Sequence, residues 1–172
     1  VPVDDEGVPT EHTQLIKDGK LVGRLHNRET AGKMGEKPTG NARALSFRFP
    51  PIPRMRNTCI ANGPHGSLKD IIKDIKLGLY ALDSAGGQTN GELFTFTAGD
   101  AFMVRNGEIA ERVKDVTISG NLFDTLKNID AVGSDYHLRD SAGGCGKAGQ
   151  MPLPVSHGSP HIRIQNCVIG GR

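Results

Sequence analysis

The feature that most constrains the fold is a pair of dipeptides suited to tight hairpin turns. Asn106-Gly107 divides the segment ELFTFTAGDAFMVRNGEIAERVKDVTISG, in which β-branched and aromatic residues lie on both sides. Asp18-Gly19 divides HTQLIKDGKLVGRLH in the same way. A type I′ turn needs positive φ at both central residues, which Asn-Gly and Asp-Gly tolerate well. The sequence therefore predicts two antiparallel β-hairpins, and a content of 23 glycines without tryptophan agrees with a turn-rich chain.

Further strands are predicted in shorter segments. Residues 41–49 and 54–61 are strand candidates, separated by the proline-rich PPIP, which no central strand could accommodate. Residues 161–171 read as a final strand with three inward-facing side chains, Ile162, Ile164 and Cys167. Residues 151–160 read as a loop.

Helical patterns are few. GSLKDIIKDIKLGLY places apolar residues at helical spacing, with Ser67 as N-cap, Asp70 three residues later and Gly78 as a terminator. Residues 121–132 show a shorter helical pattern, and residues 27–35 add one turn. We expect a β-dominated α+β domain with antiparallel hairpins and two or three short helices, spanning residues 1–172 as a single domain.

Composition narrows the class of protein. The 172 residues are 36% hydrophobic and 23% charged, with a formal net charge of +2. Lys and Arg are spread along the chain, so no nucleic acid is expected, and the apolar runs are too short to predict a membrane span. The chain has three widely spaced cysteines, which suggest reduced thiols and a cytoplasmic location.

A single cysteine among glycines, Cys145 in SAGGCGKAGQ, is the main candidate for chemistry. A phosphate-binding loop is excluded because the glycine spacing fails and Ala148 replaces the Ser or Thr that follows the lysine. A nucleophile would need a base that the sequence alone does not place near the sulfur. A zinc ligand suits a thiolate, and Lys147 or backbone N–H groups would favour the charged form. From the residues alone, an inert loop cysteine is favoured over a metal ligand.

A glycine-rich step and a histidine pair are two further candidate sites, and each also has a simpler structural interpretation. Gly86-Gly87-Gln88 indicates either a bulge or loop, or a platform where an extended peptide reaches backbone groups. His157 and His161 are four residues apart, but Gly158 and Pro160 interrupt any helix, so surface loop residues are favoured over a zinc pair.

Two charged clusters also have simple structural interpretations. Asp4 to Gly7 is interpreted as a turn with solvated carboxylates, ahead of a second shell around a cation. Arg43, Arg54 and Arg56 could hold a carboxylate, but the favoured role is to keep chain segments in register.

Eight segments, in order, resemble the carboxyl-terminal domain of the TldD/PmbA family, which contains peptidases and peptide-maturation proteins once called modulators of DNA gyrase. The matching segments cover the whole chain: DDEGVPTEHTQLIKDGKLVG, TAGKMGEKPTGNARA, PIPRMRNT, IKLGLYALDSAGGQTN with GELFTFTAGDAFMVRNGEI, VKDVTISGN, VGSDYHL, GGCGKAGQ and LPVSHGSPHIRIQNCVIGG.

The resemblance implies a longer metallopeptidase whose amino-terminal part carries a His-Glu-x-x-x-His zinc motif. It assigns the third zinc ligand to Cys145, and it implies that the companion PmbA/TldE-type subunit lacks both the histidine motif and this cysteine. We therefore expect the carboxyl-terminal domain of a TldD-type zinc peptidase, with zinc and activity only in the longer protein and with no catalytic residue in this chain. The alternative is a non-catalytic peptide-binding or subunit-assembly module of the PmbA/TldE type.

The expected partners are a peptide substrate, the protein's own amino-terminal domain, and a PmbA/TldE-type subunit or a second copy in a dimer. Five further residues are expected to contact substrate or neighbouring loops: Gly86, Gly87 and Gln88 of the glycine-rich step, Lys147 and Gln150.

Overall fold

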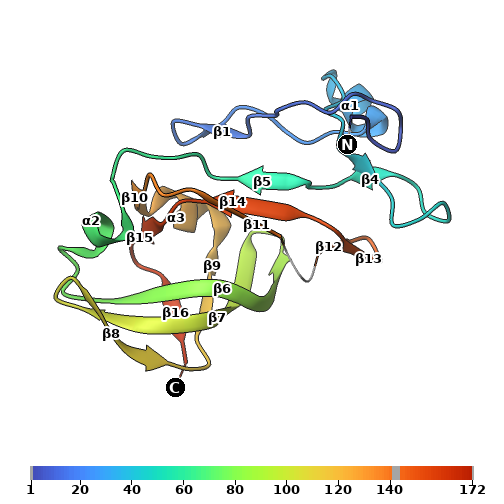
Figure 1. Ribbon diagram of the computed structural model, residues 1–172. Coiled ribbons are helices and arrows are strands. Elements are labelled where there is room, and N and C mark those ends of the chain that lie inside the picture. The colour runs from blue at the N-terminus through green and yellow to red at the C-terminus, as the bar shows by residue number, and fades with distance from the viewer. Residues whose placement is uncertain (1, 141–143, 172) are drawn as a thin grey trace. The chain divides into compact units, whose positions relative to one another are not determined.

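The computed structural model describes residues 2–140 and 144–171, which divide into two compact units. Unit 1 comprises the chain up to Cys59 together with the described residues from Leu138 to Gly158, and unit 2 comprises Ile60–His137 and the chain from Ser159. The described residues form three helices and sixteen strands (Figure 1), so the predicted β-dominated α+β class is confirmed.

Unit 1 is built from short strands. The first hairpin pairs β1 (Ile16–Lys17) with β2 (Lys20–Leu21), and its turn residues Asp18 and Gly19 have φ of 50° and 73°. The predicted hairpin is therefore confirmed. The other elements of the unit are α1 (Arg28–Met34), β3 (Ala42–Arg43), β4 (Ile52–Pro53), β5 (Asn57–Cys59), β11 (His137–Asp140), β12 (Cys145–Lys147), β13 (Gln150–Leu153) and β14 (Ser156–Ser159).

The segments around the prolines differ from the predictions. Only β3 is a strand within residues 41–49, and it pairs with β4 inside the PPIP segment as an isolated two-stranded ladder. Residues 151–160 do not form a loop, because they include strand β14. This strand pairs in parallel with β5 on one side, and β11 is its neighbour on the other side. That pairing joins segments about a hundred residues apart, which local sequence does not encode.

Unit 1 has a polar interior. All seven buried polar or charged residues of the described chain lie in this unit: Asp4, His26, Asn27, Thr39, Asn41, Arg54 and Gln150. Its buried apolar residues are few and mostly small: Val8, Ala31, Ala42 and Leu153. Because buried polar groups are costly unless hydrogen-bonded, this unit depends on hydrogen-bond networks more than on apolar packing.

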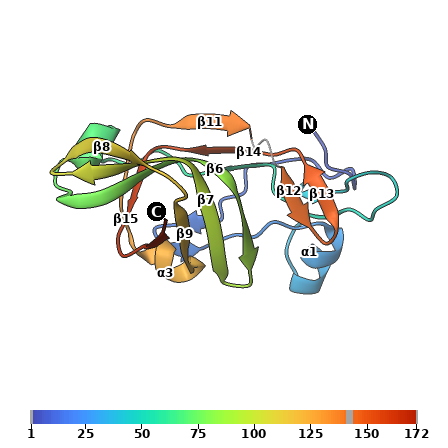
Figure 2. The ribbon, with the colours of Figure 1, turned by 90° about the horizontal axis from the view of Figure 1, so that it is seen from below.

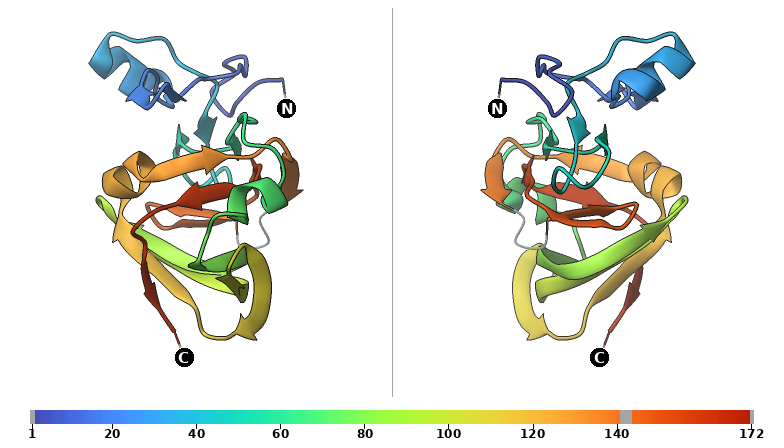
Figure 3. Two further views of the ribbon diagram at one scale, coloured as in Figure 1. Left: turned by 90° about the vertical axis from the view of Figure 1, so that its left-hand side faces the viewer. Right: turned by 90° about the vertical axis from the view of Figure 1, so that its right-hand side faces the viewer.

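Unit 2 contains the long antiparallel sheet. Strands β6 (Leu77–Asn90) and β7 (Leu93–Arg105) form a hairpin, and β7 also pairs with β8 (Glu108–Val113) and β9 (Thr117–Asn121). Figure 3 shows the last strand, β16 (Val168–Gly170, dark red), beside β9. The turn between β7 and β8 has φ of 50° at Asn106 and 81° at Gly107, so the second predicted hairpin is also confirmed.

The helices of unit 2 are shorter than predicted. Ser67 and Asp70 form the expected capping box, but α2 (Leu68–Ile72) ends well before Gly78, which lies in β6. Likewise α3 (Leu122–Lys127) gives way to β10 (Ile129–Val132), which pairs with β15 (Ile162–Ile164). Residues 161–171 therefore hold two strands, β15 and β16, in place of one. The apolar core packs Ile71, Ile72, Val104 and Ala131 together.

Candidate metal-ligand site

Cys145 lies on a strand, although the sequence suggested a flexible loop. It begins β12, which pairs with β13 through Cys145 opposite Leu153 and Lys147 opposite Gln150 (Figure 2). The turn between them uses positive φ at Ala148 (51°) and Gly149 (74°). The preceding residues 141–143 lie outside the described residues. Cys145 is half-buried and forms no disulfide, so part of the residue is accessible to solvent on a regular strand.

A buried arginine contacts this sulfur. Arg54 is 1% exposed, and its Nε–H donates to Cys145 Sγ at 3.4 Å. Its Nη2 donates to the backbone carbonyls of Cys145 and, at 3.1 Å, of Gln150. Nη1 is buried and has no hydrogen-bond partner within the described part of the chain. One guanidinium thus holds both strands of the hairpin and the thiol side chain.

The other two arginines also bind backbone carbonyls. Arg43 donates to Met55 O and Pro154 O, both at 2.8 Å, and Arg56 donates to Gly40 O at 3.1 Å. Burial lowers the pKa of the Arg43 guanidinium, and the positive charges of Arg56 and Arg54 lower it further. The interpretation that these arginines hold chain segments in register is therefore confirmed. The contact of Arg54 with the sulfur was not foreseen.

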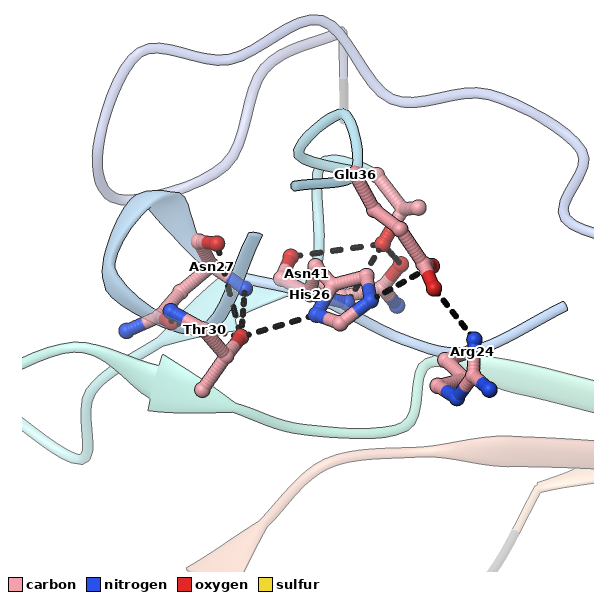
Figure 4. A network of polar contacts seen from close by, with 7 residues as sticks. Arg24, His26, Asn27, Thr30, Glu36 and Asn41 are labelled. Carbon is pink, nitrogen blue, oxygen red and sulfur yellow. Dashed lines mark hydrogen bonds and ion pairs between the residues drawn. The ribbon is translucent and has the colours of Figure 1, made fainter. Parts of the chain in front are cut away.

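A hydrogen-bond network holds the backbone of Arg54 in place, and Figure 4 shows the part of this network around His26 and Asn41. Asn41 O accepts from Arg54 N at 2.9 Å, and Asn41 Nδ2 donates to Arg54 O at 3.1 Å. Thr39 Oγ1 donates to Asn41 Oδ1 at 2.8 Å and accepts from His26 N at 2.8 Å. The His26 ring then bonds Thr30 in α1 at 3.0 Å and Glu36 at 2.9 Å. These buried contacts connect helix α1 to the backbone of Arg54.

Gln150 and Lys147, expected as substrate or loop contacts, both bond within unit 1. Gln150 is 2% exposed; its Oε1 accepts from Leu45 N at 2.8 Å and its Nε2 donates to Pro50 O at 3.1 Å. Lys147 is exposed and donates from Nζ to Pro53 O at 2.9 Å. Gln150 thus connects the hairpin to the segment between β3 and β4. Lys147 is an exposed residue two positions after Cys145 in the sequence.

The Gly86-Gly87-Gln88 step lies in unit 2, within β6. The register of β6 against β7 shifts between Ser84 and Gly86, so the bulge interpretation is confirmed. Gly86 has φ of 134°, and a Cβ on Gly87 would lie 2.3 Å from the ring of Phe96. Strand β6 is the last strand of its sheet within the described residues, and the step is exposed on it.

The histidine pair is separated by structure. His157 is exposed on β14 in unit 1, whereas His161 belongs to unit 2 and bonds Tyr80 Oη at 2.9 Å and Asp135 Oδ2 at 2.6 Å. The loop prediction is wrong for His157, which lies in a strand, whereas His161 does lie in the connection between β14 and β15 but is half-buried. Burial alone would raise the pKa of Asp135, but hydrogen bonds from the His161 backbone and ring lower it below its usual value.

The acidic turn at Asp4 to Gly7 is only partly as expected. Asp4 is 6% exposed, so its carboxylate is buried, and it accepts backbone N–H groups of Glu6, Val8 and Ala42. The prediction of a solvated carboxylate is wrong for Asp4, because these three donors replace water.

The donor set fits one ligand of a shared metal site. Within residues 2–140 and 144–171, no three His, Cys, Asp or Glu side chains gather as a possible metal site. Cys145 combines a soft sulfur, partial exposure and a positively charged N–H donor. A guanidinium donor at the sulfur suits a thiolate acceptor, which is the form that binds zinc. A site with three protein ligands would therefore need at least one ligand from outside the described residues.

Comparison with known proteins places the chain in a family. The family model of the PmbA/TldA metallopeptidase C-terminal domain matches residues 1–171. A metalloprotease of Synechocystis sp. is 58% identical over 98% of this chain and 36% of its own length. A zinc metalloprotease TldD homolog of Saccharolobus solfataricus is 37% identical over 98% of this chain and 37% of its own length. The crystal structure of TldE from Thermococcus kodakarensis superposes with a TM-score of 0.76 at 28% identity, covering 99% of this chain and 36% of that one.

The fold and these matches define a metallopeptidase C-terminal domain. The chain belongs to the TldD/PmbA family. It spans little more than a third of the length of the relatives named above. None of the helices in the described residues is long and apolar enough to cross a membrane.

Proposed function

We propose that this chain is the C-terminal domain of a zinc-dependent peptidase, in which Cys145 provides one zinc ligand. The observation that carries the proposal is the half-buried cysteine on a paired hairpin, whose sulfur accepts from the Nε–H of a buried arginine. The naming of relatives as metalloproteases, and of one as a zinc metalloprotease, supports the same chemistry.

The remaining ligands belong to the longer protein. Catalytic zinc sites take three protein ligands and keep one position open. The resemblance implies that two histidines of a His-Glu-x-x-x-His motif in the amino-terminal part are the other two ligands, and that the glutamate of the motif acts as base. Zinc held by the two histidines and Cys145 would supply Lewis-acid polarisation of a peptide carbonyl and would activate water for its hydrolysis. The role of this chain is to supply the thiolate and to hold it in place.

The proposed substrate is an extended peptide. The exposed edge of β6 presents backbone groups at Gly86, Gly87 and Gln88, and peptides bind such edges by adding a strand. The exposed ammonium of Lys147 offers a further contact next to the ligand. The activity would be maturation of peptides or small proteins in the cytoplasm, in a dimer with a PmbA/TldE-type subunit or a second copy.

The test is zinc content and peptidase activity of the full-length protein and its Cys145→Ala variant. Cys59→Ala is the matched control, since Cys59 is an exposed cysteine in the same unit. We expect one zinc per chain in the wild type and the control, and loss of both zinc and activity in Cys145→Ala. Undiminished zinc in Cys145→Ala would overturn the proposal. The chain by itself should bind no stoichiometric zinc and hydrolyse no peptide.

A second candidate function is a non-catalytic module that binds peptide or assembles subunits. The structural similarity to TldE from Thermococcus kodakarensis favours it. Cys145 argues against it, because a scaffolding subunit has no need for an arginine-held thiol. Absence of zinc from the full-length wild type, with intact binding of a partner subunit, would favour this second function.

A further inference from the structure

Arg54 is buried without a carboxylate partner among the described residues. The side chain is 1% exposed and permanently charged, yet its hydrogen-bond partners within the described chain are two carbonyls and the Cys145 sulfur, with no carboxylate among them. Nη1 has no partner there at all. Charges this deeply buried are normally paired, because leaving water is expensive.

The position of this guanidinium is fixed from both ends. Asn41 binds the backbone N–H and carbonyl of Arg54, and the network through Thr39 and His26 holds Asn41 in turn. At the other end, Nη2 binds β12 and β13 while Nε points its hydrogen at the sulfur. The planar guanidinium carries its donors at fixed angles, so fixing two of its contacts fixes the third.

We propose that Arg54 is a positioning residue for Cys145: its Nε–H holds the sulfur in the orientation required of a metal ligand. This inference rests on the proposed function, since it concerns the geometry of the same ligand. Groups that hydrogen-bond a metal ligand orient it before the metal arrives, and their loss costs about 10- to 100-fold in metal affinity.

Arg43 is the matched control for a purely structural role. It also holds two backbone carbonyls in unit 1, but no hydrogen bond joins it to the sulfur. If arginines here only keep segments in register, Arg43→Met and Arg54→Met will have the same consequences. If Arg54 positions the ligand, only Arg54→Met will alter the metal site.

The experiment is titration of the metal-free full-length protein with Co²⁺, followed by the near-ultraviolet thiolate-to-cobalt charge-transfer band. We expect Arg43→Met to lower thermal stability but to keep the wild-type Kd and band. We expect Arg54→Met to bind Co²⁺ about tenfold or more weakly, with a shifted band. Arg54→Lys keeps the charge without the fork of donors, and it should not restore the wild-type band.

The outcomes separate this inference from the proposed function. If Cys145→Ser keeps the wild-type Co²⁺ affinity, both fail. If Cys145→Ser loses affinity while Arg54→Met matches Arg43→Met in Kd and band, the inference alone fails.

A second measurement keeps Arg54 in place, so it does not require the Arg54 variants to fold. The ¹⁵N-labelled Arg54 Nε–H resonance of this chain should be protected from exchange and should shift in Cys145→Ala. An unchanged resonance in Cys145→Ala contradicts the contact.

Discussion

Replacing Gln150 by leucine should destabilise unit 1 by about 2 kcal/mol, because the amide is a clamp within the fold. The substitution removes the bonds to Leu45 N and Pro50 O, which have lengths of 2.8 and 3.1 Å. Leu45 is half-buried, so stranding its N–H costs about 1–3 kcal/mol. Pro50 is exposed, so its carbonyl turns to water and adds at most about 1 kcal/mol. Leucine keeps the buried volume, which limits any cavity contribution.

The assay is thermal unfolding of the chain followed by circular dichroism. For a chain of this size, about 2 kcal/mol lowers Tm by roughly 4–8 °C. Lys147→Met is the control: Lys147 is exposed, and the change should stay within about 0.5 kcal/mol. A Gln150→Leu variant with unchanged Tm but a raised KM in the full-length peptidase would refute the clamp and favour a direct substrate contact.

Two further predictions concern unit 2. Gly87→Ala should disturb β6 next to its bulge, because the new Cβ would lie 2.3 Å from the Phe96 ring. Hydrogen exchange along β6 should accelerate relative to Gly170→Ala in β16, where no atom lies within 4 Å of the new Cβ, and equal exchange in the two variants would contradict this. Asp135 has a lowered folded pKa, so its contribution is present above the unfolded value of about 3.9 and is lost as pH falls through the folded pKa. Urea midpoints should therefore fall less between pH 7 and pH 3 in Asp135→Asn than in the wild type, and an equal fall would contradict the role of the His161 contacts.

Sequence predicted best what local chemistry decides. The Asp18-Gly19 and Asn106-Gly107 turns formed as expected because positive φ is a property of those residues themselves. The cap at Ser67 also formed, since its partner Asp70 is three residues away. Each of these features needs only neighbouring residues.

The strands that the sequence did not predict are those formed by pairing between distant segments. The pattern after Ile72 satisfies a helix, but Leu77 to Asn90 pair with β7 along their length, and that ladder overrides the helical spacing. Residues 156–159 became a strand through parallel pairing with β5.

The candidate site shows the same division. Cys145 was identified through the resemblance, whereas its strand and its arginine were not. The sequence suggested that Arg54 keeps chain segments in register. Its contact with a sulfur 91 residues away depends on the tertiary structure, which local sequence does not reveal. The polar run Thr39 to Asn41 gave no signal that it would hold that arginine.

The most direct test of the central claim is zinc K-edge X-ray absorption on the full-length protein. The account predicts a first shell with one sulfur at about 2.3 Å beside nitrogen and oxygen ligands, and loss of that sulfur in Cys145→Ala. A first shell without sulfur in the wild type would contradict it.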